Sequence, residues 1–356
     1  MPLTPNSSIP KHSGASYLAN NFKPIEAETT TFDLEVIGHI PEALNGRLLR
    51  IGPNPASIPD PARYHWFSGS GMAHGLRLRE GRAEWYRSRY VRDASVVAAL
   101  KLPPLGGPGA GLRDGSVNTN FTSVGGKLYA VVEAGSLPVE LNYELDSIAR
   151  ADFNGTLEAG FTGHPKFDPI TGEQHALAYE PGQPVRYVSL GQNGYATTKA
   201  RIDLPHIPLI HDMAFTSSFV VIPDLPVTFQ PEHAKAKFPW LWDERRDARI
   251  GLLPRNGDVT NIQWFEAPRC FVFHFMNAYD DGHLTLIDLH SPSGVAFEVK
   301  IACIRALDKD FLPQAAPAVA QTAGSGRIRP RSRCFLAQGR RFSAQRTDLS
   351  SRFRSV

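Results

Sequence analysis

Cysteine is scarce in this chain of 356 residues, and long apolar runs are absent from it. The three cysteines, Cys270, Cys303 and Cys334, are an odd number and form no CxxC pair, which argues against a disulfide framework and against a thiolate metal site. No apolar run approaches the roughly 20 residues that a membrane-spanning helix needs, and no signal-like segment opens the sequence. These absences predict a cytoplasmic protein that does not use cysteine in catalysis.

Amphipathic helical periodicity is also rare, and residues 93–101 (DASVVAALK) are the one stretch that favours a helix. Short runs rich in branched and aromatic residues are separated by turn residues and predict strands at 46–52, 74–81, 82–91, 127–135, 219–225, 270–279 and 283–290. The chain is therefore expected to be all-β. A propeller, a sandwich and a barrel all fit, because no repeat of 40 to 50 residues selects the propeller.

Positive charge is unevenly distributed along the sequence. The net charge is +3, but the segment from Arg327 to the end contains arginine, no lysine and a single acidic residue, Asp348, so the preceding body is mildly acidic. That last segment has almost no hydrophobic periodicity, which predicts a disordered tail or out-of-frame sequence. No nucleic-acid partner is expected, since such a surface would combine lysine and aromatic residues on an organised face.

Three histidines stand at positions where metal ligands are conceivable. His164 lies in an irregular segment (TGHPKFDP), His211 precedes a predicted strand, and His274 lies inside the run 270–279. They are 47 and 63 residues apart, a spacing that suits ligands from successive blades or hairpins and not a local chelate. Imidazole-rich sites suit Fe(II) and oxygen chemistry. A lone histidine is more often a packed or surface side chain than a metal ligand, and this alternative stays open at this point.

The run CFVFHFMNAY suggests a face for His274. Alternation places Cys270, Val272, His274 and Met276 on one face and the three phenylalanines, Phe271, Phe273 and Phe275, on the other. A histidine on a strand that is apolar on both faces needs a partner.

Eight motifs, in order, carry a resemblance to a known family. They are RIGPNPA (50–56), YHWFSGSGMAHGLRL (64–78), AEWYRSRYVRD (83–93), KLYAVVEAGSLPVEL (127–141), TGHPKFDPITGE (162–173), IHDMAFT (210–216), ARIGLLPRNG (248–257) and FHFMNAYDDG (273–282). Together this region, from about residue 30 to 295, resembles the carotenoid cleavage oxygenases.

The resemblance implies a seven-bladed β-propeller with a non-haem Fe(II) on its axis, held by four histidines. It implies that His164, His211 and His274 match three of these ligands, and that Glu133 matches a glutamate that accepts an N–H from a ligand ring. Gly163 and Pro165 are expected to shape the approach of His164. The implied reaction uses O2 to cleave a conjugated C=C bond of an apolar polyene, a carotenoid or apocarotenoid, into two carbonyl products. A stilbene-cleaving branch carries a lysine near the position of Val132, so phenolic stilbenes are not expected.

Other parts of these motifs are interpreted as architecture. Gly69, Gly71 and Gly75 are expected to permit positive φ in a hairpin. His65 and His74 match no ligand position and are expected to be structural.

The segment 225–251 combines aromatic residues with lysines. In the family an apolar surface at the tunnel mouth touches the membrane, so Phe229, Phe238, Trp240 and Trp242 are candidates for a substrate tunnel or a peripheral membrane patch. Packing of an internal loop is the alternative.

The end of the sequence departs from the family. The last histidine is His290, no glutamate follows Lys300, and nothing after that position resembles the fourth ligand or the remaining glutamates. We expect an extension at 1–29, a partial propeller of about five blades at 30–300, and a non-family tail at 301–356, through truncation or a frameshift. With the fourth histidine missing, activity is doubtful. The alternatives are an iron-free propeller remnant that binds an apolar ligand or a partner, and a non-folding product.

Overall fold

The computed structural model describes residues 17–32, 34–58, 60–61, 64–108, 114–233, 239–267, 269–281, 284–290, 296–302 and 335–337. Within them the chain is built almost entirely of antiparallel strands, as the sequence predicts, and the strands divide between two compact units. The first unit comprises 1–212 and 227–242, and the second comprises 213–226 and 243–356.

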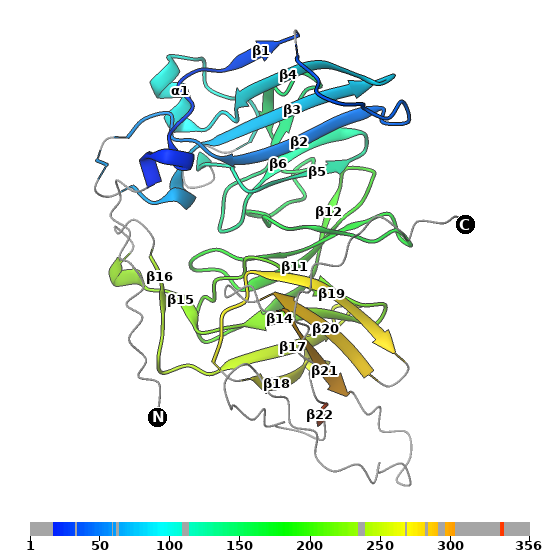
Figure 1. Cartoon of the computed structure of the whole chain (residues 1–356). Coiled ribbons are helices and arrows are strands. Elements are labelled where there is room, and N and C mark those ends of the chain that lie inside the picture. Colours follow the sequence, from blue (N-terminus) through cyan, green and yellow to red (C-terminus); the bar gives the residue numbers. More distant parts are fainter. Residues whose placement is uncertain are drawn as a thin grey trace, which may run out of the picture. The chain divides into compact units, whose positions relative to one another are not determined.

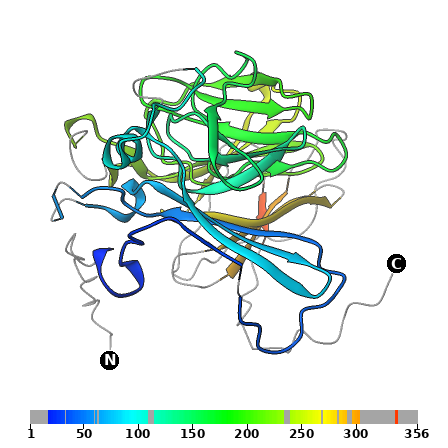
Figure 2. The same ribbon diagram turned by 90° about the horizontal axis from the view of Figure 1, so that it is seen from above.

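The first unit holds three four-stranded sheets and one two-stranded ribbon. Figure 1 shows β2, β3 and β4 side by side, and Figure 2 shows the same strands, blue to cyan, still adjacent from a second direction. The strands of the three sheets are β1 (Thr29–Thr31), β2 (Gly46–Pro53), β3 (Gly71–Arg79) and β4 (Arg82–Tyr90); β5 (Asn120–Val124), β6 (Lys127–Val131), β7 (Val139–Leu141) and β8 (Ser147–Arg150); β9 (Lys166–Phe167), β10 (Gln174–Ala178), β11 (Val185–Leu190) and β12 (Ala196–Ile202). The ribbon pairs β15 (Val227–Phe229) with β16 (Trp240–Trp242).

The second unit holds two four-stranded sheets. One consists of β13 (Ala214–Phe215), β14 (Phe219–Asp224), β17 (Ala248–Pro254) and β18 (Gln263–Ala267), and the other of β19 (His274–Asp281), β20 (Leu284–His290), β21 (Ala296–Ala302) and β22 (Phe335–Ala337). The five four-stranded sheets among the described residues agree with the expected five or so blades. The expected boundaries at 30 and 300 stay predictions, and most of the expected tail lies outside the described residues.

The predicted helix is present as α1 (Ala94–Leu100). It begins where the carboxylate of Asp93 accepts a hydrogen bond from the backbone N–H of Val96, and it ends at Lys101, which adopts the left-handed conformation. The remaining described helices are single 3-10 turns at Asn20–Phe22, Trp66–Ser68, Pro231–His233 and Val259–Asn261.

Neighbouring sheets within the first unit pack face to face. One cluster joins Ala73 of the first sheet, and Val91 directly after β4, to Ala130 and Val139 of the second sheet. A second cluster joins the second sheet to the third, and every residue of β10 and β11 is buried, because both faces of these strands are covered.

The interpretation of the run 270–279 was wrong in detail. His274 is the first residue of β19, so Cys270 to Phe273 precede the strand, and the register shifts between Phe275 and Asn277. Val272 and Phe275, expected on opposite faces, both pack in the core of the second unit. Strict alternation holds only inside a regular strand.

The expected role of three glycines was also wrong. Gly69, Gly71 and Gly75 all lie outside the positive-φ region. A Cβ on Gly71 would lie 2.0 Å from the carbonyl oxygen of Val117. Glycine is therefore required at position 71 for close backbone approach and not for an unusual φ.

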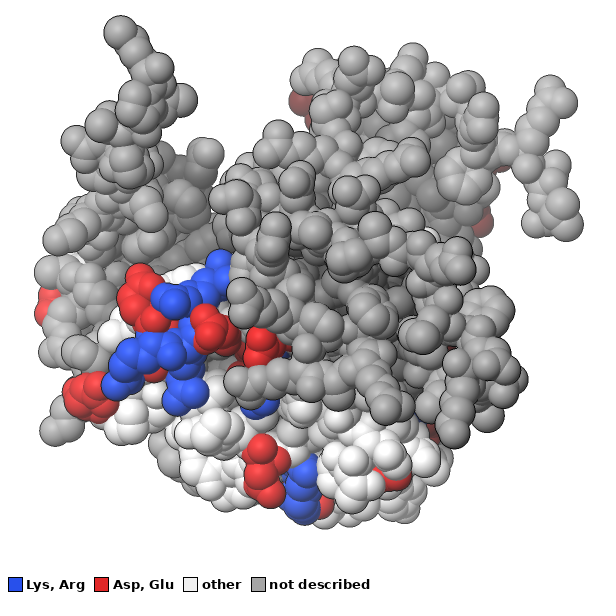
Figure 3. Space-filling view, turned by 90° about the horizontal axis from the view of Figure 1, so that it is seen from below, with Lys and Arg blue, Asp and Glu red and all other residues white. Residues whose placement is uncertain are grey.

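The surface seen from below carries both signs of charge. Figure 3 shows basic and acidic side chains next to one another on the described part of that face. In the second unit, ion pairs join Arg246 to Asp243 and Arg269 to Asp247. No helix among the described residues has the length and apolar character to cross a membrane.

Candidate metal centre

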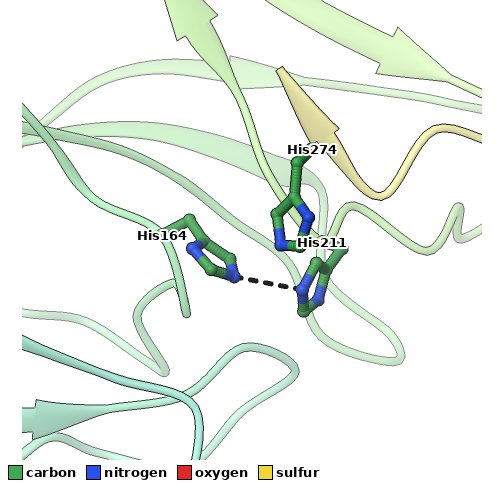
Figure 4. Close-up of side chains that lie close together, drawn as sticks. All are labelled: His164, His211 and His274. Atoms are coloured by element: carbon green, nitrogen blue, oxygen red, sulfur yellow. Dashed lines mark hydrogen bonds between the residues drawn. The ribbon is translucent and has the colours of Figure 1, made fainter. Parts of the chain in front are cut away.

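Two of the three predicted ligands meet in the first unit. His164 lies in the irregular loop before β9, as expected, and His211 lies three residues before β13. Their Nε2 atoms are 3.0 Å apart, and the two rings are inclined at 66°. Figure 4 shows the two imidazoles pointing toward each other, with the contact drawn as a dashed line.

Glu133 fixes the protonation of His211. Its Oε1 atom lies 2.8 Å from Nδ1 of His211, and both side chains are largely buried, at 15% exposure each. A carboxylate can only accept, so Nδ1 of His211 carries the proton and its Nε2 presents a lone pair. His164 then donates its Nε2 proton to His211 in the absence of a metal. The glutamate thus leaves His211 in the tautomer that a metal ion requires.

Gly163 makes room for this carboxylate. A Cβ at position 163 would lie 2.5 Å from Oε2 of Glu133 and 2.8 Å from Cγ2 of Thr119. The Oε2 atom is buried and has no hydrogen-bond partner in the described part of the chain. Glycine at position 163 therefore lets Glu133 pack against the backbone next to His164, and its expected influence on the approach of His164 stays a prediction.

His274 is the third predicted ligand. It is exposed and opens β19. It belongs to the second unit, and its role as a ligand beside His164 and His211 stays a prediction. Neutral imidazole nitrogens, such as those of His164 and His211, suit a divalent transition metal.

A cavity of about 790 Å³ in the first unit adjoins this centre. Glu133 and His211 contribute to its wall. Most of the remaining wall is apolar or aromatic and includes Ile51, Pro53, Trp66, Phe67, Val132, Leu209 and Trp240. Such a cavity suits a largely apolar ligand.

Tyr179 lines the same cavity and was not anticipated from the sequence. It is 1% exposed, and burial, together with the negative charge of Glu133, raises the pKa of its phenol well above the ordinary value. The group is therefore a neutral hydroxyl at any physiological pH. The run ALAYEPG around it carries no motif that could have singled it out.

The aromatic candidates of segment 225–251 fall into different environments. Trp240 is buried against Tyr179 and Phe229 and lines the cavity, whereas Trp242 is exposed. Phe238 lies outside the described residues. A role for any of them in a tunnel or at a membrane stays a prediction.

Comparison with known proteins agrees with these features. The family model for retinal pigment epithelial membrane protein matches residues 22–338. A carotenoid cleavage oxygenase of Mycobacterium tuberculosis is 38% identical over 309 residues, covering 74% of this chain and 62% of that protein. An isoeugenol monooxygenase of Pseudomonas putida is 34% identical, covering 76% of this chain and 60% of that protein.

A solved structure supports the fold. The lignostilbene dioxygenase of Pseudomonas brassicacearum superposes with a TM-score of 0.68 at 27% identity, covering 79% of this chain and 60% of that one. The chain thus spans about six-tenths of the length of these relatives.

Proposed function

We propose that this chain, which belongs to the retinal pigment epithelial membrane protein family of carotenoid oxygenases, has one specific function. It provides the metal-binding part of a non-haem Fe(II) dioxygenase. The reaction is the cleavage of a conjugated C=C bond of a carotenoid or apocarotenoid by O2. The observation that carries this proposal is the arrangement of His164 and His211, oriented by Glu133, at an apolar cavity.

The side chains present fit Fe(II). His164 and His211 already face each other through Nε2, and a cation held by both would replace the proton that they share. His274 is the proposed third ligand. Fe(II), when bound, would supply the activation of O2, and insertion of both oxygen atoms across one C=C bond gives two carbonyl groups. Glu133 holds the tautomer of His211 throughout.

The cavity positions the substrate. Its apolar wall excludes water from the polyene and holds the chain of conjugated bonds in a fixed orientation, which is the main contribution that a protein makes beside a reactive metal. Val132 adds an apolar side chain next to Glu133, which favours a polyene over a phenolic stilbene at this position. The neutral hydroxyl of Tyr179 places no charge against the polyene.

Iron content tests the proposal. The protein is purified without oxygen, loaded with Fe(II), desalted and analysed for iron per chain, together with His164→Ala, His211→Ala and His274→Ala variants. We expect close to one iron in the unmodified chain and loss of most of it in each variant. His39→Ala, which removes an exposed histidine outside the centre, is the matched control and should retain the metal.

Two outcomes separate the proposal from its alternative. Folded chain that holds no iron but still binds an apocarotenoid would replace the dioxygenase by an iron-free binding module. Iron that persists in all three histidine variants would place the metal elsewhere. With iron bound as expected, carbonyl products from an apocarotenoid in the presence of O2 are the second measurement.

A further inference from the structure

A row of polar side chains crosses one face of the first sheet. Arg50 of β2 is paired directly with His74 of β3, and Tyr86 of β4 lies diagonally across from His74 on the same face, because His74 itself pairs with Ser88. All three side chains line the apolar cavity described above. His74, expected to be structural, therefore also lines this cavity.

His74 and Tyr86 together present one spare hydrogen-bond donor. Nδ1 of His74 is 2.8 Å from the hydroxyl of Tyr86, and both residues are half-buried. Burial, with a smaller contribution from Arg50, lowers the pKa of His74, so the imidazole is neutral at physiological pH. A neutral imidazole and a phenol carry one donor proton each, and their mutual bond uses one. The other remains, either on Nε2 of His74 or on the hydroxyl of Tyr86.

Arg50 adds a fixed positive charge to this row. Among the described residues no carboxylate forms an ion pair with it, and the one carboxylate lining the cavity, Glu133, is bonded to His211. A guanidinium presents a planar fork of donors that matches a carboxylate, and such charge-assisted bonds are roughly twice as strong as neutral ones.

We propose that Arg50, His74 and Tyr86 form a subsite that binds the carboxylate end of an otherwise apolar polyene. Arg50 takes the carboxylate by its guanidinium, and the spare donor of the His74 and Tyr86 pair takes a lone pair of the same group. The apolar remainder lies along Ile51, Trp66 and Phe67 in the same cavity. This inference deepens the proposed function, because it takes the cavity as the substrate cavity and names its substrate class as polyene acids.

Binding of a matched pair of probes tests the subsite without metal or O2. All-trans-retinoic acid and methyl retinoate differ only at the end group, and their binding to the metal-free chain is followed by quenching of tryptophan fluorescence, since Trp66 and Trp240 line the cavity. We expect the acid to bind about tenfold to a hundredfold more tightly than the ester, as charge-assisted bonds predict.

The variants assign this preference to the row. Arg50→Gln should remove most of the preference for the acid, because it weakens binding of the acid and leaves binding of the ester unchanged. Arg50→Lys should retain part of the preference, and Tyr86→Phe should reduce it severalfold. Arg82→Gln removes an exposed arginine of the same sheet that does not line the cavity and should change nothing. Arg50 is itself exposed, so its replacement is not expected to impair folding.

Equal binding of acid and ester by the unmodified chain would overturn the subsite. An Arg50→Gln variant that binds the acid and the ester more weakly by the same factor would also overturn the subsite, because the arginine would then act on the shape of the cavity. Neither result depends on iron or on product formation, so failure of the subsite and failure of the dioxygenase proposal are separate outcomes.

Discussion

Gly163 is the residue whose replacement best separates orientation of a ligand from folding. In Gly163→Ala the new Cβ would meet Oε2 of Glu133 at 2.5 Å and Cγ2 of Thr119 at 2.8 Å. The carboxylate is the far end of a flexible side chain, so it is expected to move and release His211, while Thr119 shifts by a smaller amount. Loss of such a partner typically weakens metal binding about 10- to 100-fold. Anaerobic equilibrium dialysis with Fe(II) measures the change.

A second glycine supplies the control for that prediction. Gly46, at the start of β2, has no atom within 4 Å of an added Cβ and has no positive φ, so Gly46→Ala should leave the affinity for Fe(II) unchanged. An unaltered affinity in Gly163→Ala would show that Glu133 does not orient His211.

Cys270 is expected to be a slow nucleophile in the folded chain. Burial raises the pKa of its thiol to about 11 from 9.0. At pH 8 the thiolate fraction falls about 100-fold, while the higher basicity restores nearly a factor of ten in nucleophilicity, so alkylation should be roughly tenfold slower than in the unfolded chain. Mass spectrometry of the Cys270 peptide after timed iodoacetamide treatment measures this, and equal rates in native and unfolded protein would contradict it.

The same thiol makes stability depend on pH in one direction. Its folded pKa lies above the unfolded value, so the unfolded chain releases the proton first as the pH rises from 9 to 11. The contribution of this thiol to the free energy of unfolding is therefore complete below pH 9 and is lost as the pH rises from 9 to 11.

The residues of the metal centre could be selected from sequence, but those of the cavity could not. His164, His211 and His274 each stand in a motif that resembles the family, whereas their wide spacing alone left a packed or surface role open. Arg50, His74 and Tyr86 lie on three separate strands, and their common face follows only from the strand register. Tyr179 lacks any local signal because its importance comes from tertiary burial.

At the scale of the element, α1 depends on its cap. Asp93 accepts hydrogen bonds from the N–H of Val96 and the hydroxyl of Ser95, and Val96 anchors the helix in a cluster with Met72 and Tyr90. Asp93→Ala should cost about 1 kcal/mol, which corresponds to about fivefold faster amide exchange in α1. Asp93→Asn keeps the accepting oxygen and should cost less. Equal exchange in both variants would assign the effect to the lost charge.

Strand positions were easier to predict than strand ends and faces. The runs 46–52, 82–91 and 219–225 agree with β2, β4 and β14 to within one or two residues, because branched residues and turn residues mark them clearly. The run 270–279 misled because apolar residues continue through the connection before β19. Composition could not distinguish a buried connection from a buried strand.

At the scale of the molecule, each compact unit has a hydrophobic core of its own. Phe161 is fully buried in the cluster that joins the second and third sheets of the first unit. Phe265 is 2% exposed in the core of the second unit, together with Val221, Leu252 and Phe275. The clusters that contain these two phenylalanines share no residue. A destabilising substitution in one core should therefore first reduce the stability of the unit that contains it.

Paired core variants test this independence, each serving as the control for the other. Phe265→Ala removes a buried ring at a cost of about 3 to 5 kcal/mol and should accelerate amide exchange in β14 and β17 while β10 and β11 stay protected. Phe161→Ala should do the reverse. Hydrogen exchange resolved by peptide distinguishes this from a single cooperative unfolding, in which either variant would raise exchange equally in all four strands. That second result would mean that the two units unfold together, because loss of one core would then remove protection from both.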